Sequence, residues 1–534
     1  MKIAPRWRSA LLLCSILLLP LIVHRDAYRG YFTEDDMDFI TWARFVPFTD
    51  YLRALPSLVY PAGRPVGYAY YWALNRIAGL NYGPWVVALQ LIGVVNVSLL
   101  WLLMRKSGLG EAATAAGCLF FVSSRALFDA WSTPRFIYDV LCTTFALTSL
   151  LAYAHRKWVL SFAAFWLGMR SKEIGVAIPV LLLCYELTLG DRKWKRIIPF
   201  ALPAAFFGAS GLWSSLHMTT LYRVRFAPQT MWKTMSYYSS ALLWIPYAGC
   251  LMLLLPFATR DRRAYFGVGA MVCGVAIYLL LPDRLLEAYL YLAMTGAAIG
   301  FAAFSARYPL AAAILALAWI PWQCVLIRQQ ARVALDEADQ RRAYVSALRT
   351  APDASAYLYS GAPDSLHDWG VEAALRIFHG NGVTARSLDG ESLPESEHMQ
   401  LLTWDAKTRR MRPESFSPND YASLPEAARP AEWQRASGWS SEGGYRALLE
   451  RASVRLFQSG RAVEFTWEAC GAPDSALGVF LDGEQTARVV FSKSGCVNSV
   501  APVKAGLSRM VTVDFLVEPA GRPVRIGAFG FRSP

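Results

Sequence analysis

Charged residues are scarce in this chain of 534 residues: Asp, Glu, Lys and Arg make up 17% of it, and 55% is hydrophobic. A soluble domain normally has about a quarter charged residues, so the composition excludes a single soluble domain, as well as a disordered or collagen-like chain. The sequence therefore predicts a membrane protein with a sizeable aqueous part. The net charge of +13 then indicates loops that face anionic lipid, and we expect membrane lipids but no nucleic acid among its partners.

The motifs of several enzyme classes are also missing. The sequence has no Gly-x-x-x-x-Gly-Lys-Ser/Thr loop, no Gly-x-Ser-x-Gly elbow, no His-Glu-x-x-His and no Cys-x-x-Cys. These absences argue against P-loop nucleotide hydrolysis, α/β-hydrolase, zinc-protease and thioredoxin-like chemistry. The six histidines lack the spacing of metal ligands, and we interpret them as isolated residues.

Apolar runs alternate with short basic segments up to residue 327, and no such run follows. The runs predict an α-helical polytopic membrane domain with about eleven spans. The predicted spans are 9–24, 85–104, 111–128, 136–154, 158–170, 174–189, 197–216, 239–258, 264–281, 288–304 and 309–327. No small-x-small cleavage site follows Val23, so we interpret the first run as a retained anchor, with a signal peptide as the alternative.

Lys and Arg cluster at every second junction between these spans, which predicts a cytoplasmic N-terminus. The loops 25–84, 129–135, 171–173, 217–238 and 282–287 then lie outside, as do residues 328–534. Several cations break this charge bias by lying near the outer side, and such cations could bind a phosphate or diphosphate. They are Arg64, Arg125, Arg135, Arg170, Lys172, Arg223, Arg225 and Arg284.

The first outer loop, 25–84, carries four acids within five positions, Glu34, Asp35, Asp36 and Asp38. Large apolar residues bracket them, so we expect this segment to pack against the membrane domain, where partial desolvation would favour a general base. A solvated charged loop is one alternative reading. A divalent cation that bridges Asp35, Asp36 and a phosphate is another, although the spacing excludes an EF-hand.

Four motifs occur in order at predicted outer membrane edges. They are Tyr31-Phe32-Thr33-Glu34-Asp35-Asp36-Met37-Asp38 followed by Gly63-Arg64-Pro65-Val66, Gly79-Leu80-Asn81 before a span, Ser171-Lys172-Glu173 followed by Tyr185-Glu186-Leu187, and Asp283-Arg284-Leu285-Leu286-Glu287. Together they resemble GT-C glycosyltransferases, especially the protein O-mannosyltransferases with lumenal TPR repeats. The resemblance covers about residues 5–327. Two features depart from that family: Ser132-Thr133-Pro134-Arg135 replaces a His-Pro-x-His-like segment, and no TPR repeat follows the last span.

The resemblance implies a GT-C-like fold and transfer of a sugar from a polyprenyl-phosphate donor to an acceptor hydroxyl outside the membrane, with inversion. It implies that Asp35 or Asp36 is the base and that Arg64, Lys172 and Arg284 bind the donor phosphate. Glu173 would orient Lys172 or the acceptor; a local Lys172–Glu173 pair at a helix break is the alternative. The acceptor could be protein, lipid or polysaccharide. No cofactor is required by this reading, apart from the divalent cation considered above.

Two other classes of function are compatible with a multispanning chain, a transporter or flippase for lipid-linked saccharides and a non-catalytic assembly factor. The two halves show no matching hydrophobic repeats with paired Gly or Pro breaks, which a transporter would favour. The C-terminus carries no ER-retention signal, and we expect the inner membrane of a bacterium.

The tail is expected to form an extracytoplasmic α/β unit at 328–411, a linker at 412–453 and a β-sandwich-like domain at 454–534. It begins with a polar helix at 328–350. Seven of the nine cysteines lie in or beside predicted spans, and only Cys470 and Cys496 lie in the tail. They are candidates for a disulfide that closes a loop of about 25 residues, with two separate buried thiols as the alternative.

Overall fold

The computed structural model describes residues 5–57, 64–217, 222–366, 369–387 and 399–416, and the strands of the last domain, 449–459, 462–471, 475–481, 484–491, 495–503, 510–518 and 523–530. The chain forms two compact units, Met1–Asp339 and Gln340–Pro534. The central part of the expected linker, 417–448, lies outside the described residues, whereas its first residues belong to a strand.

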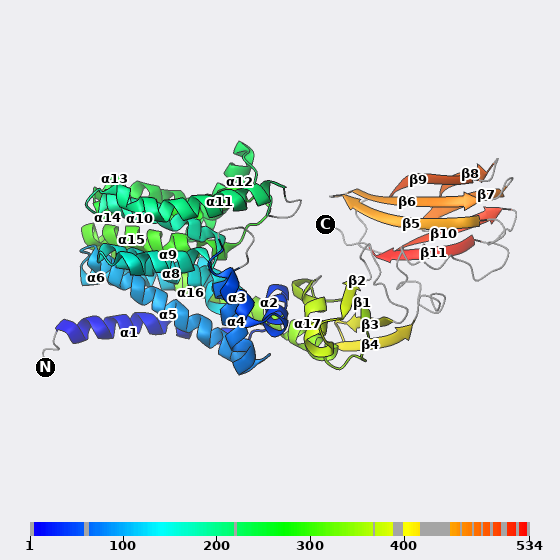
Figure 1. The fold of residues 1–534 in the computed structure, drawn as a ribbon, viewed down its shortest axis with the longest axis horizontal. Coiled ribbons are helices and arrows are strands. Elements are labelled where there is room, and N and C mark those ends of the chain that lie inside the picture. The colour runs from blue at the N-terminus through cyan, green and yellow to red at the C-terminus, as the bar shows by residue number, and fades with distance from the viewer. Residues whose placement is uncertain are drawn as a thin grey trace. The chain divides into compact units, whose positions relative to one another are not determined.

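All regular secondary structure in the described part of the first unit is helical (Figure 1). Its helices before residue 160 are α1 Pro5–Val23, η1 Arg25–Arg29, α2 Glu34–Phe45, α3 Phe48–Ala54, α4 Pro65–Ala78, α5 Tyr82–Lys106, α6 Glu111–Val122, η2 Arg125–Leu127, α7 Phe128–Ser132, η3 Pro134–Phe136, α8 Ile137–Ala154 and α9 Trp158–Met169. The later ones are η4 Glu173–Ala177, α10 Ile178–Thr188, η5 Trp194–Ile197, α11 Ile198–His217, α12 Pro228–Leu243, η6 Ala248–Leu254, α13 Leu255–Thr259, α14 Arg262–Ala276, η7 Ile277–Leu280, η8 Glu287–Leu290, α15 Tyr291–Arg307 and α16 Pro309–Leu348.

Six helical segments of the described chain are long and apolar enough to cross a membrane. They are Tyr82–Lys106, Pro134–Ala154, Trp194–His217, Arg262–Leu280, Glu287–Arg307 and Pro309–Leu348. Three of the other expected spans correspond to shorter apolar helices, Ser9–Val23, Glu111–Val122 and Trp158–Met169. The chain is therefore a polytopic membrane protein, as predicted, with six or seven candidate spans where about eleven were expected.

The expected span at 239–258 is not a straight helix. Pro228–Leu243 and Ala248–Thr259 meet at 84°, and Trp244 and Tyr247 between them have φ of 60° and 58°. Pro246 lies between these two residues and cannot donate a backbone hydrogen bond, so the helix breaks here.

The last span and the polar helix expected at 328–350 are one continuous helix, α16, of 40 residues. Neither Gly nor Pro occurs between Pro321 and the end of α16, so nothing in the sequence stops the helix where its composition changes from apolar to polar. The first compact unit ends at Asp339, within α16.

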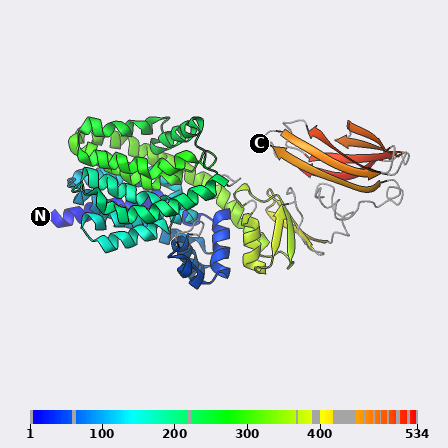
Figure 2. The ribbon, with the colours of Figure 1, turned by 45° about the horizontal axis from the view of Figure 1, so that its top comes forward.

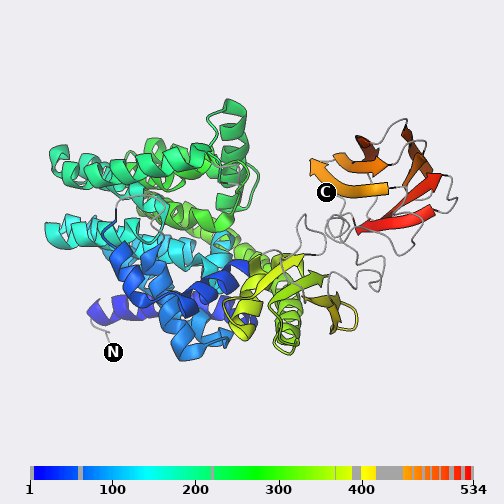
Figure 3. The same cartoon turned by 45° about the vertical axis from the view of Figure 1, so that its right-hand side comes forward.

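Helices α14 and α15 pack with their backbones in contact. A Cβ atom added at Gly267 would lie 2.4 Å from the Gly300 nitrogen, and one added at Gly296 would lie 2.3 Å from the Met271 nitrogen. Small residues permit this approach between membrane helices, where van der Waals packing replaces the hydrophobic effect as the driving force. The two helices run side by side in Figures 1 and 3.

The acidic segment of the first outer loop packs against the membrane domain, as expected from its apolar flanks. Phe32 and Ile40 are fully buried, and the Phe32 ring meets the Trp85 ring at 5.5 Å with an interplanar angle of 86°. Edge-to-face pairs of this kind contribute about 1 kcal/mol beyond the area they bury. They fix the start of α2 on α5, which carries Trp85.

The second unit contains two β regions. In the first, β1 Ala356–Ser360, β2 Thr384–Ser387, β3 Met399–Asp405 and β4 Arg410–Phe416 form a sheet in the order β2-β1-β3-β4. β1 is parallel to β2 and β3, and β4 is antiparallel to β3. The amphipathic helix α17 Trp369–His379 connects β1 to β2 and buries Val371, Ala374 and Leu375.

The strands of the second region form two antiparallel sheets, which lie in separate layers in Figure 2. One has the order β11-β10-β7-β8 and the other the order β5-β6-β9. Their bounds are β5 Leu449–Ser459, β6 Ala462–Gly471, β7 Ser475–Leu481, β8 Glu484–Phe491, β9 Gly495–Val503, β10 Met510–Glu518 and β11 Pro523–Gly530. The β structure thus begins at Leu449, slightly before the expected residue 454.

Candidate functional site

The two central acids of the first outer loop occupy different environments. Asp36 is fully buried, and its carboxylate accepts hydrogen bonds from the backbone and hydroxyl of Thr33, both at 2.9 Å, and from the hydroxyl of Tyr71 at 2.8 Å. Burial raises the pKa of Asp36, and these hydrogen bonds oppose the rise. Asp36 therefore completes a capping box at the start of α2 and has no free lone pair directed at solvent.

Asp35 is accessible, with 23% of its side chain exposed. Its Oδ2 atom lies 4.0 Å from Nη1 of Arg135 and 4.0 Å from Nη2 of Arg284. These distances give electrostatic attraction but are too long for hydrogen bonds. Two guanidinium groups thus face this carboxylate, and neither of them is within hydrogen-bond distance of its Oδ2 atom.

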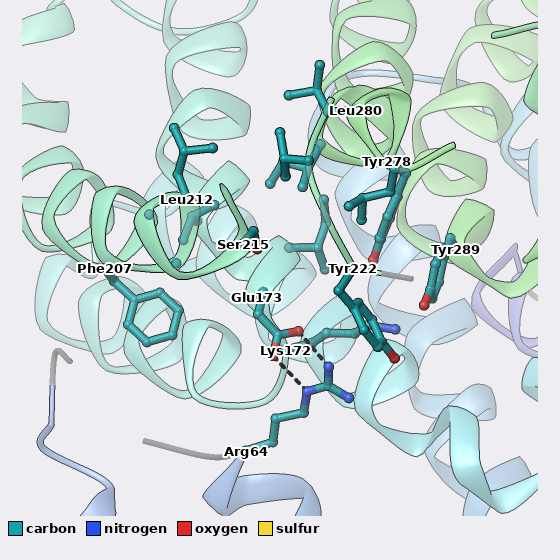
Figure 4. Close-up of a pocket in the computed structure, with 17 residues that line it drawn as sticks. Arg64, Lys172, Glu173, Phe207, Leu212, Ser215, Tyr222, Tyr278, Leu280 and Tyr289 are labelled. Carbon is teal, nitrogen blue, oxygen red and sulfur yellow. Dashed lines mark hydrogen bonds and ion pairs between the residues drawn. The ribbon is translucent and has the colours of Figure 1, made fainter. Parts of the chain in front are cut away.

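Arg64 is held by Glu173. Their side chains form a two-point ion pair in which Nε donates to Oε1 and Nη2 donates to Oε2, each at 2.9 Å (Figure 4). Burial alone would raise the pKa of Glu173, but the neighbouring Arg64 holds it below its usual value. Glu173 therefore orients Arg64, whereas the sequence had suggested Lys172 or the acceptor.

Lys172 pairs with Asp139 of α8, and both side chains are almost completely buried. The Lys172 ammonium also lies 4.3 Å from the centre of the Tyr289 ring, a cation–π contact. An acidic side chain within a predicted span is itself a sign of a functional role, because its burial is costly. Asp139 within the predicted span 136–154 carries this sign in the sequence itself.

These cations border a cavity of about 290 Å³. Its polar end is formed by Arg64, Lys172 and Glu173, and much of the remaining wall is apolar or aromatic (Figure 4). The other lining residues are Ile174, Val176, Phe207, Gly208, Gly211, Leu212, Ser215, Tyr222, Val224, Ile277, Tyr278, Leu280, Leu281 and Tyr289. The cavity can therefore hold an amphiphile with an anionic head and an apolar tail.

Arg284 connects this cavity to Asp35. Its Nε atom lies 3.3 Å from the hydroxyl of Tyr289, and its guanidinium lies 4.8 Å from the centre of the Tyr222 ring. Both tyrosines line the cavity, and Arg284 also faces Asp35. Each of the five predicted outer loops thus contributes to one cluster of residues.

The other predicted outer cations lie elsewhere or are occupied structurally. Arg125 forms an ion pair with Glu287 at 2.6 Å, Arg170 is buried and donates to the carbonyl of Ala54, and Arg225 pairs with Asp283 at 2.8 Å. The sequence analysis assigns Arg135 no role in catalysis: it is one of the outer cations and belongs to the segment that departs from the family pattern. Its proximity to Asp35 now places it beside the candidate base.

A divalent cation shared by Asp35 and Asp36 would meet existing contacts at both carboxylates. The oxygens of Asp36 are engaged by Thr33 and Tyr71, and Asp35 faces two cationic side chains. In the described part of the chain, no group of three or more His, Cys, Asp or Glu residues could hold a metal ion. A bridging metal would have to displace these contacts.

Cys470 and Cys496 are directly opposite each other in the antiparallel pair β6–β9. Opposite Cα atoms in such a pair lie about 4.5–5.5 Å apart, which is within the range that a disulfide spans. Their side chains are outside the described part of the structure, so the disulfide stays a prediction.

No protein-family model matches the chain. Two solved structures similar to it are those of ArnT from Cupriavidus metallidurans, one bound to undecaprenyl phosphate and one in the apo state. Each similarity covers 76% of this chain and 94% of the ArnT chain at 12% sequence identity. The TM-scores are 0.45 for the bound and 0.46 for the apo structure.

Proposed function

We propose that this protein is a membrane glycosyltransferase that moves a sugar from a polyprenyl-phosphate donor to an acceptor hydroxyl. The observation that carries the proposal is the amphiphilic cavity, with Arg64 and Lys172 at its polar end and Arg284 between its aromatic wall and Asp35. A lipid phosphate has the matching distribution of charge and apolar surface. The proposed partners are this lipid-linked donor and a protein, lipid or polysaccharide acceptor.

In the proposed reaction Asp35 is the general base. The acceptor hydroxyl attacks the anomeric carbon and gives its proton to the Asp35 carboxylate as the bond between that carbon and the phosphate oxygen breaks. The electron pair of the broken bond stays on the lipid phosphate. Attack from the face opposite the phosphate inverts the anomeric configuration.

Arg64, Lys172 and Arg284 serve the leaving phosphate, whose negative charge grows as the bond breaks. Positioned cations stabilise such growing charge without reorganising at the moment of reaction. Glu173 acts through Arg64, because its two-point pair fixes the plane of that guanidinium. Asp36 has no chemical role in this proposal and instead shapes the start of α2.

The proposed orientation places the N-terminus in the cytoplasm, and the cluster of loops and the second unit on the outer side of a bacterial inner membrane. The expected eleven spans belong to the same proposal. It draws support from the meeting of all five predicted outer loops at one site. Loops that alternate between the two sides of a bilayer could not all contribute to one cluster of contacts.

The test is transfer by the purified full-length protein in lipid nanodiscs, using a panel of polyprenyl-phosphate sugars and extracted cell-envelope acceptors. We expect transfer from at least one donor and its loss in Asp35→Asn. Asp50→Asn is the matched control, because Asp50 is a carboxylate of the same loop that makes only a surface pair with Arg53. Normal transfer by Asp35→Asn would contradict the proposed base.

A further inference from the structure

The two cations at the polar end of the cavity are neutralised in different ways. Arg64 and Glu173 both line the cavity, with 27% and 34% of their side chains exposed. Of the pair Lys172 and Asp139, with 7% and 5% exposed, only Lys172 lines it. A phosphate in the cavity can therefore compete with Glu173 for Arg64, whereas it meets a Lys172 ammonium that is already paired with Asp139, a residue that does not line the cavity.

We propose that Asp139 is a positioning residue that holds Lys172 at the cavity wall and limits the affinity of the cavity for the lipid-phosphate product. This inference rests on the proposed function. Asp139 pairs with the Lys172 ammonium and is not among the residues that line the cavity. Its charge acts on the phosphate through Lys172, and the Tyr289 ring at 4.3 Å limits where that ammonium can move.

The reasoning depends on how the charge of the phosphate changes during transfer. The donor is a phosphodiester with one negative charge, and the product is a monoester that carries two when it is fully ionised. Because Coulomb energy scales with the product of the charges, the Asp139 carboxylate repels the product about twice as strongly as the donor. Asp139 thus opposes retention of the product more than it opposes binding of the donor.

A lysine without a counter-charge would have the opposite effect. An ammonium with little access to solvent and no carboxylate partner gains most from binding a dianion. The product would then remain bound after the sugar has left. The buried Lys172–Asp139 pair therefore favours release of the product and hence turnover, whereas an unpaired lysine would favour retention of the product.

The test measures binding of two probes to the full-length protein in detergent at pH 8. Farnesyl phosphate represents the dianionic product, and its methyl ester represents the monoanionic donor. We expect Asp139→Asn, which keeps the shape and a hydrogen-bond acceptor, to bind farnesyl phosphate about tenfold more tightly, with a smaller gain for the methyl ester. Lys172→Met should weaken both probes.

Weaker or unchanged binding of farnesyl phosphate by folded Asp139→Asn would overturn the inference, because a merely structural residue could only lower affinity when it is changed. Such a result, together with normal binding by the wild type and weakened binding by Lys172→Met, would leave the proposed function intact. Failure of the wild type to bind either probe would instead reject the proposed lipid-phosphate site, and this inference with it.

A measurement on the wild type alone keeps the inference testable should Asp139→Asn fail to fold. We expect the wild type to bind farnesyl phosphate at most about threefold more tightly than the methyl ester, because Asp139 cancels much of the benefit of the second charge. A preference for the dianion of about tenfold or more would show that Asp139 does not lower the affinity of the cavity for the dianion. This result would overturn the inference.

Discussion

Asp35 lies 4.0 Å from Arg284, and this contact joins the first outer loop to the loop before α15. The neighbouring Asp36 points into the protein and is closed off by Thr33 and Tyr71. Adjacent residues at the start of a helix face different directions, so only one of the two acids can face a substrate. The structure thereby separates a candidate base from a capping residue within one acidic cluster.

Asp35→Asn should lower turnover on the order of a hundredfold or more, because the amide cannot accept the proton of the acceptor. Binding of the lipid-phosphate donor should change little, since Asp35 is not among the residues that line the cavity. Steady-state kinetics and direct donor binding measure the two effects separately. A parallel loss of donor binding would assign Asp35 to the donor site instead.

Asp36→Ala should destabilise the protein by about 2 kcal/mol, because it removes a helix cap and leaves the buried Tyr71 hydroxyl without its acceptor. Thermal unfolding in detergent measures this change. Tyr71→Phe is the matched control, since it removes one of the same hydrogen bonds and retains the carboxylate. Folded Asp36→Ala protein should keep wild-type donor affinity, and a selective loss of turnover without a loss of stability would restore Asp36 as the base.

The pH dependence of stability should differ between wild type and Asp36→Asn. Burial raises the pKa of Asp36. The stability linked to its protonation is therefore fully present when the pH is below the usual pKa of aspartate. It is lost as pH rises through the elevated pKa. Asn cannot titrate, so the difference in melting temperature between the two proteins should change across this window. A constant difference from pH 4 to 8 would contradict the elevated pKa.

Arg64→Lys should weaken donor binding about tenfold although the charge is kept, because lysine cannot form a two-point pair with Glu173 and hold a planar fork toward the phosphate. Arg53→Lys is a suitable control, since Arg53 lies on the surface of the same loop. Isothermal titration with the methyl ester of farnesyl phosphate, the analogue of the donor, compares the variants. Equal affinity of Arg64→Lys and wild type would show that Arg64 contributes only its positive charge to donor binding, and not the geometry of its guanidinium.

Unreduced protein should contain a Cys470–Cys496 disulfide, because the residues face each other across β6 and β9 and the second unit is proposed to lie in an oxidising compartment. Alkylation before and after reduction, followed by mass spectrometry, detects the bond. Closing this loop of about 25 residues should contribute about 3 kcal/mol to the stability of the domain. Two free thiols accessible only from the cytoplasmic side of sealed vesicles would contradict both the bond and the proposed orientation.

The sequence predicted the helical membrane part well because its signals are local. Long apolar runs and their basic punctuation follow directly from the thickness and charge of a bilayer. The position of the break near Pro246 and the continuation of α16 past Arg328 were missed, although both have local causes. Both depend on single residues, Pro246 in one case and the lack of Gly or Pro after Pro321 within α16 in the other, and not on the average composition of a segment.

Partnerships within the site were harder to predict. The residue types at Asp35, Arg64 and Lys172 were found, because acids and cations at an outer membrane edge are conspicuous. The pairing of Glu173 with Arg64 and of Asp139 with Lys172 depends on how distant helices pack, which the spacing of residues in one sequence does not reveal. The difference between Asp35 and Asp36 likewise depended on the position of Tyr71.

The backbone contact between α14 and α15 also determines which wall of the cavity can change over evolution or in engineering. α14 continues into Tyr278, and Tyr289 stands just before α15, so a side chain added at Gly267 or Gly296 would move the residues at both ends. By contrast, only 22% of the most apolar stretch within Trp194–His217 is buried, and α11 contributes Gly208 and Gly211 to the cavity wall. A preference for a longer, shorter or more saturated carrier chain would therefore be selected through side chains on α11, against a fixed α14–α15 wall.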